Sequence, residues 1–196
     1  MKINLMSASQ VKTQLGITAS TYDTSIASML PIVSTDVRRI LNTEYNQYLL
    51  CTFDSTSTDL KSSWDVDIHG LRKEDFYLEI GRVVQHDNIP DDTYISEYDA
   101  ENHIYTLSAT PTGTGTYCYP TIRISQWRTI AKMIWYRIEK LSTDMPESKV
   151  SQKRMGPLSI TFRDSTINHR WDYPQELIDD LGVPFLRVGR GIGAWG

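Results

Sequence analysis

The chain has 196 residues, of which 40% are hydrophobic and 22% are charged, so it is long enough to bury a core of its own. Its formal net charge of −4 argues against the class of globally basic nucleic-acid-binding proteins. No apolar run approaches the roughly 20 residues that a transmembrane helix needs, and the N-terminal stretch is too short and too polar for a signal peptide. Composition therefore predicts a soluble protein without a membrane partner.

Two short helices are predicted near the ends of the chain. Ser7 and Gln10 fit a capping box, in which Ser7 caps the helix and Gln10 reaches back to the Ser7 amide. Gly16 supplies a left-handed stop, so this helix spans about 8–15. A second short helix is predicted at 173–182, because a proline lies early in this segment and a glycine ends it.

Two long helices show the clearest periodicity. One runs from about 21 to 43, and Pro31 inside it predicts a kink or a break because proline removes an amide donor. The other runs from about 125 to 145 and ends at Pro146. The first apolar stripe consists of Tyr22, Ile26, Met29, Leu30, Val33, Val37, Ile40 and Leu41, and the second of Trp127, Ile130, Ala131, Ile134, Ile138, Leu141 and Met145. The opposite face of the second helix carries Arg128, Lys132, Arg137, Glu139 and Lys140 and is predicted to be solvated.

Between the long helices, the period changes from helical to alternating. Serine and threonine crowd 55–63, which predicts a surface loop. Short alternating segments separated by turns follow across about 64–124 and predict a small antiparallel sheet or barrel. Turns are expected at 99–102 and 112–115. After the last long helix, a polar loop leads to one alternating strand at 157–163.

Together these elements predict an α+β fold: an antiparallel helical-bundle core with an inserted small antiparallel β subdomain and an extended C-terminal tail. The helical core domain is discontinuous and comprises 1–43 and 120–182. The inserted β-rich subdomain comprises 44–119, and the extended arm comprises 183–196. The two long apolar stripes are expected to face each other, because each must be buried against something.

No residue pattern predicts catalysis, a cofactor or a metal site. The four histidines match no compact metal motif, and solvated imidazoles beside turns are the simpler interpretation. Asp65 and Asp67 flank a strand residue, so they belong either to a solvated strand face or to a divalent cation site. The glycine-rich stretch 189–193 follows no strand and opens no helix, so it lacks the context of a phosphate loop. The histidines are His69, His86, His103 and His169.

The two cysteines, Cys51 and Cys118, lie far apart without a CxxC spacing. They are predicted to be free thiols in a protein made in a reducing cytoplasm, and a disulfide between them is the alternative. The chain also carries eleven Tyr and five Trp, residue types that favour interfaces as well as cores.

Two segments are candidate interaction sites. The loop that contains Lys149, Lys153 and Arg154 is basic, which serves either solubility or contact with a phosphate backbone or an acidic neighbour. The arm at 183–196 is too apolar to stay in water and too rich in glycine to bury itself, so it is expected to become ordered when it docks. Its candidate docking residues are Phe185, Leu186, Arg187, Arg190, Ile192 and Trp195.

The order of parts resembles the head–tail connector (adaptor) proteins of tailed bacteriophages. The opening Ser9–Ile17 with the long helix Tyr22–Leu41 is similar to the two-helix start of that family. The segment Lys153–Phe162, which is basic, then glycine, then an alternating strand, is similar to the segment that follows the family's central helix. The stretch from Tyr94–Asp99 through 104–107 to Gly115–Tyr117 looks like a hairpin found in many phage neck and virion proteins.

The resemblance implies a structural virion protein in the neck, assembled in the host cytoplasm, with no enzymatic activity and no cofactor. About twelve copies would form a homo-oligomeric ring under the portal, with a DNA channel along the symmetry axis. The implied partners are other copies of the chain, the portal protein, a downstream neck, stopper or tail protein, and packaged double-stranded DNA through non-specific contact. The arm would bind the portal, and the basic loop would face the channel or a neighbouring subunit.

Two other classes stay open at this point. A DNA-binding regulatory protein would use the N-terminal helix pair as its reader, although net acidity weighs against it. A small hydrolase lacks an assembled nucleophile. The mass of the particle discriminates among the three, since a regulator should be a dimer, an enzyme is often a monomer, and an adaptor forms a ring alone or on its portal.

Overall fold

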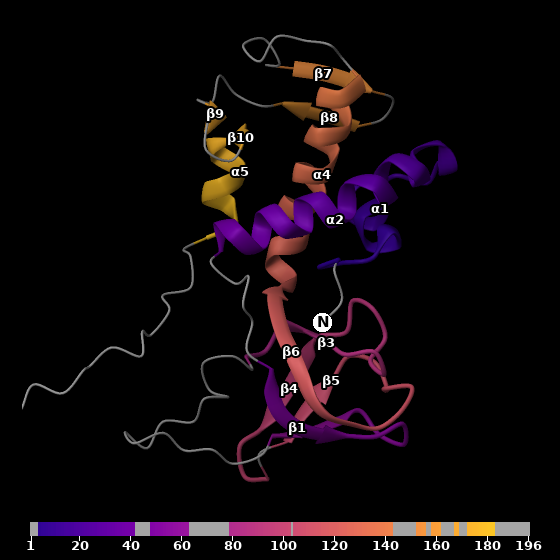
Figure 1. Ribbon diagram of the computed structural model, residues 1–196, viewed down its shortest axis with the longest axis vertical. Coiled ribbons are helices and arrows are strands. Elements are labelled where there is room, and N and C mark those ends of the chain that lie inside the picture. The colour runs from indigo at the N-terminus through magenta and orange to yellow at the C-terminus, as the bar shows by residue number, and fades with distance from the viewer. Residues whose placement is uncertain are drawn as a thin grey trace, which may run out of the picture.

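The computed structural model describes residues 4–41, 48–62, 79–102, 104–142, 152–155, 158–161, 167–168 and 172–182 (Figure 1). For residues 141–142 and for the strands between 152 and 168, the description covers the backbone only. The molecule is elongated, with a six-stranded antiparallel sheet at one end and a group of helices at the other. Two separate apolar cores match these two ends.

The first helix, α1 (Ala8–Leu15), confirms the prediction for 8–15. Ser7 Oγ accepts the Gln10 amide at 3.0 Å, and Gly16 adopts φ 67° at the C-terminus. The reciprocal half of the predicted capping box is wrong, because the Ser7 amide donates at 2.8 Å to the carboxylate of Asp92 in the sheet region. The start of α1 is therefore fixed by a long-range contact as well as by its own cap.

The second helix, α2 (Asp23–Ile40), follows a short 3-10 turn, Ser20–Tyr22, and continues through Pro31. The predicted break does not occur. Both halves of the helix are buried against the same core, Ile26 and Leu30 before the proline and Val33 and Val37 after it. Burial on both sides of the proline outweighs the loss of one backbone hydrogen bond.

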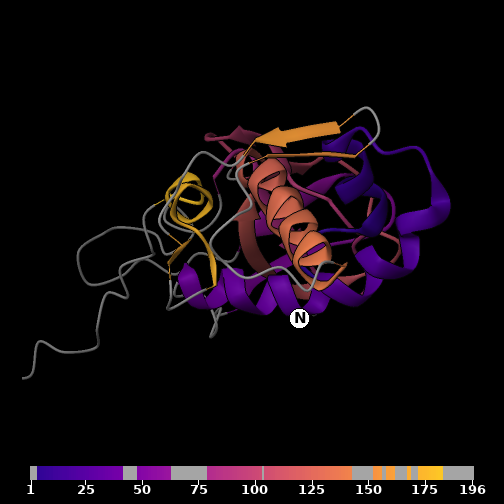
Figure 2. The same cartoon turned by 90° about the horizontal axis from the view of Figure 1, so that it is seen from above.

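The central helix, α4 (Trp127–Ser142), is buried on nearly every side rather than along one stripe. It packs against α1, α2 and α5 (Gln175–Asp180), which surround it in the view from above (Figure 2). The predicted solvated face is wrong at Glu139, which is only 6% exposed and accepts the Trp135 indole N–H at 2.9 Å. The predicted packing of the two long helices against each other is confirmed for the described residues.

The sheet is a nearly closed antiparallel barrel. Its strands occur in the order β3-β6-β1-β2-β5-β4, and a bridge between Val83 and Tyr94 links its two edges. The Val84 amide reinforces that closure by donating to the Thr93 carbonyl at 3.0 Å. The strands are β1 (Leu49–Phe53), β2 (Asp59–Ser62), β3 (Arg82–Gln85), β4 (Ile95–Asp99), β5 (Ile104–Leu107) and β6 (Gly115–Arg123).

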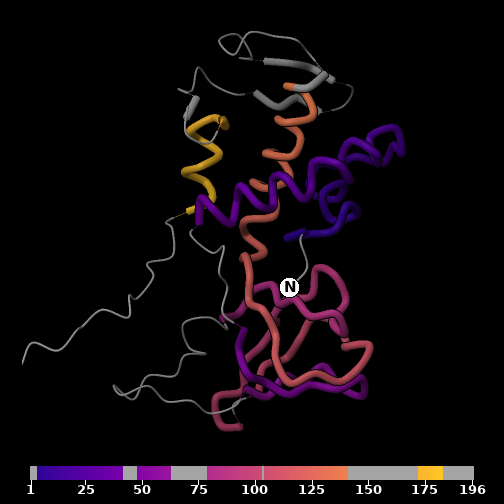
Figure 3. The backbone as a smooth tube through the Cα atoms, in the orientation of Figure 1, coloured from indigo at the N-terminus to yellow at the C-terminus, as the bar shows by residue number. Residues whose placement is uncertain are grey.

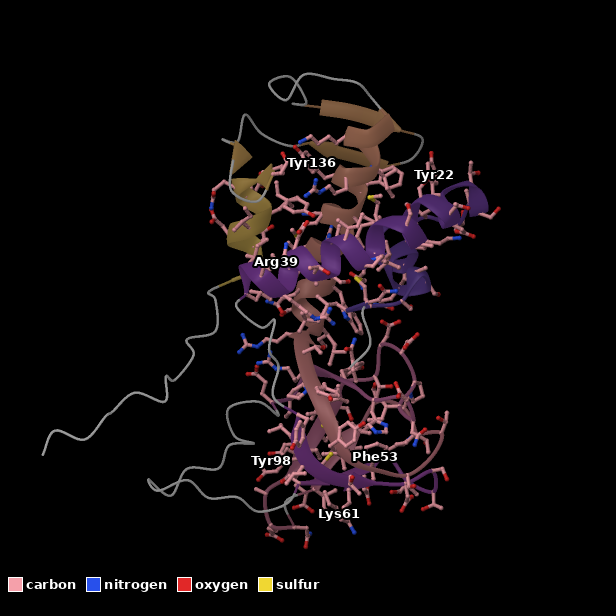
Figure 4. All side chains as sticks on the ribbon, in the orientation of Figure 1. Tyr22, Arg39, Phe53, Lys61, Tyr98 and Tyr136 are labelled. Carbon is pink, nitrogen blue, oxygen red and sulfur yellow. The ribbon has the colours of Figure 1, made fainter. Side chains whose placement is uncertain are left out.

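The barrel has a core of its own, distinct from the helical one. Side chains from all the strands of the barrel fill it, and Figure 4 labels Phe53 among them. The buried residues of this core are Leu49, Cys51, Phe53, Leu60, Val84, Ile89, Ile95, Tyr105, Leu107 and Cys118. This core buries the inner face of the barrel, whereas Val83 of β3 and Ile122 of β6 are buried in the helical core.

These observations correct the predicted fold class. The protein is not an antiparallel helical bundle with a small β insertion, but a sheet-rich α+β molecule in which a six-stranded barrel stands beside four described α-helices. The helix α2 crosses α4 at a steep angle instead of running antiparallel to it (Figures 1 and 3). The physical reason is that β6 continues directly into α4 through the turn Ile124–Gln126, so the strand sets the direction of the helix.

Two further strand pairs follow α4. The strands β7 (Gln152–Met155) and β8 (Leu158–Thr161) form a two-stranded antiparallel sheet, so the predicted lone strand has a partner within the segment that was predicted as a loop. A second pair joins β9 (Ile167–Asn168) and β10 (Tyr173–Pro174). The predicted strands around 64–68 and most of the one around 76–80 lie outside the described residues, and the predicted domain boundaries stay predictions.

Replacing Ile134 tests the packing of α2 on α4. This side chain is fully buried in the helical core, so Ile134→Asp should lower the free energy of unfolding by more than about 3 kcal/mol through an unpaired buried charge. The matched control is Ile32→Asp on α2, where the side chain is 46% exposed and the loss should stay within about 0.5 kcal/mol. Chemical denaturation measures both, and an equal loss in the two variants would contradict the packing.

Candidate functional site

The residues predicted from the sequence as docking sites fall mostly outside the described part of the chain. This holds for Lys149 and for the six arm residues Phe185, Leu186, Arg187, Arg190, Ile192 and Trp195. Lys153 and Arg154 lie on β7, in register with Ile160 and Ser159, and not in a loop. Of the four histidines only His86 is described, and Asp65 and Asp67 are not.

The described surface instead presents an aromatic patch on the outside of the barrel, which sequence reasoning missed. Tyr48 is 57% exposed and Leu50 is 56% exposed. Around them lie Tyr117 and Tyr119 of β6, whose ring centroids are 5.9 and 6.5 Å from that of Tyr48. The His86 ring packs on Tyr117 at 4.8 Å. Tyr48, Leu50, His86, Tyr117 and Tyr119 together are called the tyrosine patch below.

Strand alternation places the patch on the outer face. Tyr117 is paired with Leu50 in the register of β1 and β6, whereas Cys118 is paired with Leu49 and is buried. Successive side chains of a strand point to opposite faces, so Tyr117 and Tyr119 share the outer face while Cys118 fills the core. The alternating sequence Tyr-Cys-Tyr carried this signal, but only its pairing with β1 shows that the tyrosines meet Tyr48.

Gly115 and Phe53 support the patch from below. A Cβ atom on Gly115 would lie 2.2 Å from Phe53 Cζ, so the aromatic ring occupies the space that any other residue would need. The Phe53 ring in turn contacts the His86 ring at 5.1 Å. The position of His86 in the patch therefore depends on a buried ring that requires a glycine opposite it.

The described part of the barrel is acidic. Residues 48–62, 79–102 and 104–123 carry nine acidic and three basic side chains. Of the three basic residues, Arg82 is buried and Arg123 is paired with Glu79 at 2.6 Å. The acidic residues are Asp54, Asp59, Glu79, Asp87, Asp91, Asp92, Glu97, Asp99 and Glu101. Such a surface repels a phosphate backbone and favours a cationic partner.

An ion cluster of one buried side chain and two that are more exposed lies at the end of β6, where the chain leaves the barrel. Arg82 is 2% exposed, donates to the Thr121 carbonyl at 2.8 Å and also pairs with Glu79. Arg123 donates to both Glu79 oxygens, at 2.6 and 2.9 Å. Burial opposes ionisation of Glu79, but the hydrogen bonds and charges of the two arginines hold the pKa of its carboxyl below the usual value. This cluster is structural, since all its charged groups face one another.

A second network fixes α5, from which the chain runs on to the arm. Asp36 Oδ2 accepts from Tyr173 Oη at 2.8 Å and from Arg137 Nη2 at 3.2 Å. Asp172 accepts from Arg137 at 3.1 Å and from Lys140 at 2.5 Å. The Arg137 guanidinium also lies over the Tyr173 ring, 4.6 Å from its centroid. Tyr136, labelled in Figure 4, packs on the same ring at 6.1 Å.

No local pattern in the sequence indicates this network, because its members come from three segments that are distant in the chain. Arg137 and Lys140 are predicted to be solvated, but both side chains are partly buried in the structure. Arg137 forms an ion pair with Asp36, and Lys140 forms one with Asp172. Burial raises the pKa of Tyr173 well above its usual value, against the opposing effect of Arg137. The network therefore holds the root of the arm in a fixed place against α2 and α4.

Both cysteines are free thiols, as predicted, and the structure shows that both are buried. A hydrogen bond with Cys51 and burial raise the pKa of the Cys118 thiol, which favours its protonated form. Within the described ranges, no group of three or more His, Cys, Asp or Glu side chains is placed to hold a metal ion. In the same part of the chain, no helix has both the length and the apolar character needed to cross a bilayer.

Comparison of the chain with protein-family models, with characterised proteins and with solved structures gives no match.

Replacing Tyr173 by Phe should remove the bond to Asp36 and lower the free energy of unfolding by about 1–2 kcal/mol at neutral pH. Because the folded pKa is raised, the contribution of Tyr173 is fully present below the ordinary tyrosine pKa of about 10 and is lost as the pH rises above it. The stability of the native protein should therefore decline in alkali, and Tyr173→Phe should weaken that decline. Urea denaturation at several pH values measures this. Tyr48→Phe is the exposed control, and an equal effect in both variants would contradict the network.

Replacing Gly115 by Ala should displace the Phe53 ring and cost about 1–3 kcal/mol of stability. The matched control is Gly113→Ala, whose added Cβ meets only the side chain of Asn88, at 3.1 Å. Thermal denaturation gives the stabilities, and ring-proton NMR shifts of His86 and Tyr117 report the patch. Unchanged shifts with unchanged stability would show that the ring does not need the glycine.

Proposed function

We propose that the protein is a structural assembly subunit, a head–tail adaptor that forms a homo-oligomeric ring between the portal and the tail of a tailed bacteriophage, around the DNA channel. The observation that carries the assembly role is the tyrosine patch. Tyrosine-rich apolar surface is typical of protein–protein interfaces, because the rings supply large contact area at low entropic cost while their hydroxyls stay hydrated. The portal, the ring and the channel rest on the family resemblance of the sequence.

The hairpin formed by β7 and β8 supports the same proposal. It is a two-stranded sheet separate from the barrel and lies beyond the end of α4 (Figure 1). A two-stranded hairpin is marginally stable in water by itself and gains stability when it packs against another surface. In a ring, a neighbouring subunit supplies that surface, and Lys153 and Arg154 on β7 give it positive charge toward an acidic neighbour or toward DNA.

The fixed position of α5 gives the arm a defined starting point. The Asp36–Arg137–Asp172 network holds α5 against α4, and residues 183–196 follow directly. An arm that starts from a rigid element has fewer arrangements to lose when it binds, so docking costs less entropy. By the resemblance, its apolar residues and its two arginines enter a groove of the portal.

The alternative, a DNA-binding regulator that reads with its N-terminal helix pair, is disfavoured by the surface of α2. The exposed positions of this helix carry one acidic and one basic residue, and Lys12 of α1 is paired with Asp23 at 2.8 Å. A reader helix needs several free basic or amide side chains toward the groove. The exposed positions are Asp23, Thr24, Ala27, Ser28, Ile32 and Arg39.

Deleting 183–196 tests the proposal. The deletion leaves both apolar cores and the α5 network intact, so the truncated protein should fold and unfold at nearly the same temperature as the full chain. It should no longer co-sediment with rings of the cognate portal protein, because the arm's apolar burial is lost. The charge-preserving control is the full-length variant Trp195→Leu, which should bind with reduced affinity. Full occupancy by the truncated protein would remove the arm from the interface.

A further inference from the structure

The tyrosine patch leaves apolar surface open to solvent. Tyr48 is 57% exposed and Leu50 is 56% exposed. Tyr117 lies beside both of them, because it is paired with Leu50 in the register of β6 and β1 and its ring centroid is 5.9 Å from that of Tyr48. The Tyr119 ring lies 5.6 Å from the Tyr117 ring. The four side chains therefore form one continuous exposed surface, which is the pattern of an interaction site.

The strands beside the patch carry acidic side chains on the same outer face. Lys61 of β2 is paired with Thr52 of β1, two residues along the strand from the patch, so Lys61 shares its face. Asp59 lies two residues before Lys61 and has the same orientation. Asp59 is paired with Thr106 of β5, and Glu97 of β4 is paired with the same threonine. The strand register therefore adds two carboxylates and one ammonium to the outer face.

Two more carboxylates border the patch. Asp54 directly follows Phe53 and Asp87 directly follows His86, and the rings of Phe53 and His86 are in contact. Both aspartates are exposed. Hydrogen bonds from Thr56 lower the pKa of the Asp54 carboxyl, which favours its charged form. A segment that binds at the patch therefore gains from positive charge, whereas an acidic segment is repelled.

The C-terminal arm has the composition that matches this surface. Residues 183–196 carry Arg187 and Arg190 and no acidic side chain. They also carry large apolar side chains, among them Phe185, Ile192 and Trp195. An arginine guanidinium binds the face of a tyrosine ring and also pairs with carboxylates, and Phe and Trp rings pack edge to face on tyrosine rings. The arm and the patch are therefore complementary in charge and in apolar character.

We propose that, when no portal is bound, the tyrosine patch of one copy binds the arm of a second copy. The two arginines of the arm contact the tyrosine rings and the carboxylates that border the patch, and its aromatic side chains cover the exposed apolar surface. The complementarity follows from the two surfaces themselves. That the arm belongs to a second copy, and not to the same molecule, rests on the proposed assembly function.

The patch and the root of the arm lie in different parts of the elongated molecule. The patch is carried mainly by the barrel strands β1 and β6, whereas α5, which precedes the arm, packs against α4 in the helical group (Figure 1). Residues 183–196 span about 45–50 Å when fully extended, so the arm can bridge to a copy that stands beside its own. Each copy offers one arm and one patch, and such a contact can be repeated around a ring.

Sedimentation velocity of the full-length protein, without portal or DNA, tests the proposal. Reversible association is expected, with a dissociation constant on the order of 10–100 μM. It should weaken at high salt, because salt screens the charged contacts. A synthetic peptide of residues 183–196 should compete with the arm and return the protein to monomers. The same peptide with Arg187→Glu and Arg190→Glu should not compete, because it places negative charge against an acidic surface.

Two matched variants locate the contact. Leu50→Ser removes apolar surface from the patch, and Ile80→Ser removes a side chain that is 65% exposed outside it. Both positions are exposed, so both variants should fold. Leu50→Ser should weaken association at least about tenfold, whereas Ile80→Ser should change it by less than about twofold. Tyr48→Ser is a second patch variant and should act in the same direction as Leu50→Ser.

Three results would overturn the proposal. The first is a protein that stays monomeric up to about 1 mM, well above the expected dissociation constant. The second is equal weakening of association by Leu50→Ser and Ile80→Ser. The third is a monomer in which Leu50→Ser shifts the NMR signals of residues 183–196, which would assign the patch to the arm of the same molecule.

The head–tail role is measured separately, by co-sedimentation with the portal, whose groove would compete with the patch for the same arm. Copies that associate through arm and patch but leave the portal bare would contradict the adaptor role and keep this contact. Copies that bind the portal but never associate without it would remove this contact and keep the adaptor role.

Discussion

The structure depends on the direct continuation of β6 into α4. Residues Gly115–Arg123 pair with β1 and β3, and after one short turn the chain forms the helix that α1, α2 and α5 surround. The barrel core and the helical core are thus built around two halves of one segment (Figure 3). The cluster of Glu79, Arg82 and Arg123 lies where the strand ends, and Tyr94 meets Trp127 with ring centroids 6.0 Å apart just beyond it. Ion pairs and an aromatic contact therefore connect the barrel to the helices at the point where β6 continues into α4.

Local patterns were sufficient to predict the elements whose signal lies in a few neighbouring residues. The cap at Ser7, the stop at Gly16 and the apolar periods of α2 and α4 each depend on contacts within one or two turns. The strand β5 and the turn at 99–102 belong to the same class, since Asp99 binds the amides of Glu101 and Asn102. For these segments the predicted elements are present, although the break at Pro31 and the solvated face of α4 are wrong.

Features that depend on distant partners were not predictable in this way. The strand β2 lies in a segment rich in serine and threonine, and only its pairing with β1 and β5 makes it a strand. The crossing of α2 and α4 follows from the direction that β6 imposes, which no periodicity contains. Arg137 and Glu139 are charged, as surface residues usually are, but both are bound inside the molecule. Arg137 donates to Asp36, which is distant in the sequence, and Glu139 accepts from the buried Trp135 one helical turn away. The tyrosine patch needed the register of β1 against β6. Of the candidate site, the sequence therefore predicted an abundance of interface-type aromatics but not their place.

The proposed assembly role rests on three described features: the tyrosine patch on the acidic barrel, the separate β7–β8 hairpin, and the network that holds α5 against α2 and α4. Imaging the full-length protein mixed with its cognate portal, by negative-stain electron microscopy, tests this claim most directly. If the protein is a head–tail adaptor, the images should show an added ring of subunits, coaxial with the portal and open at its centre for DNA. A stable dimer that leaves the portal bare and binds one DNA sequence selectively would contradict it.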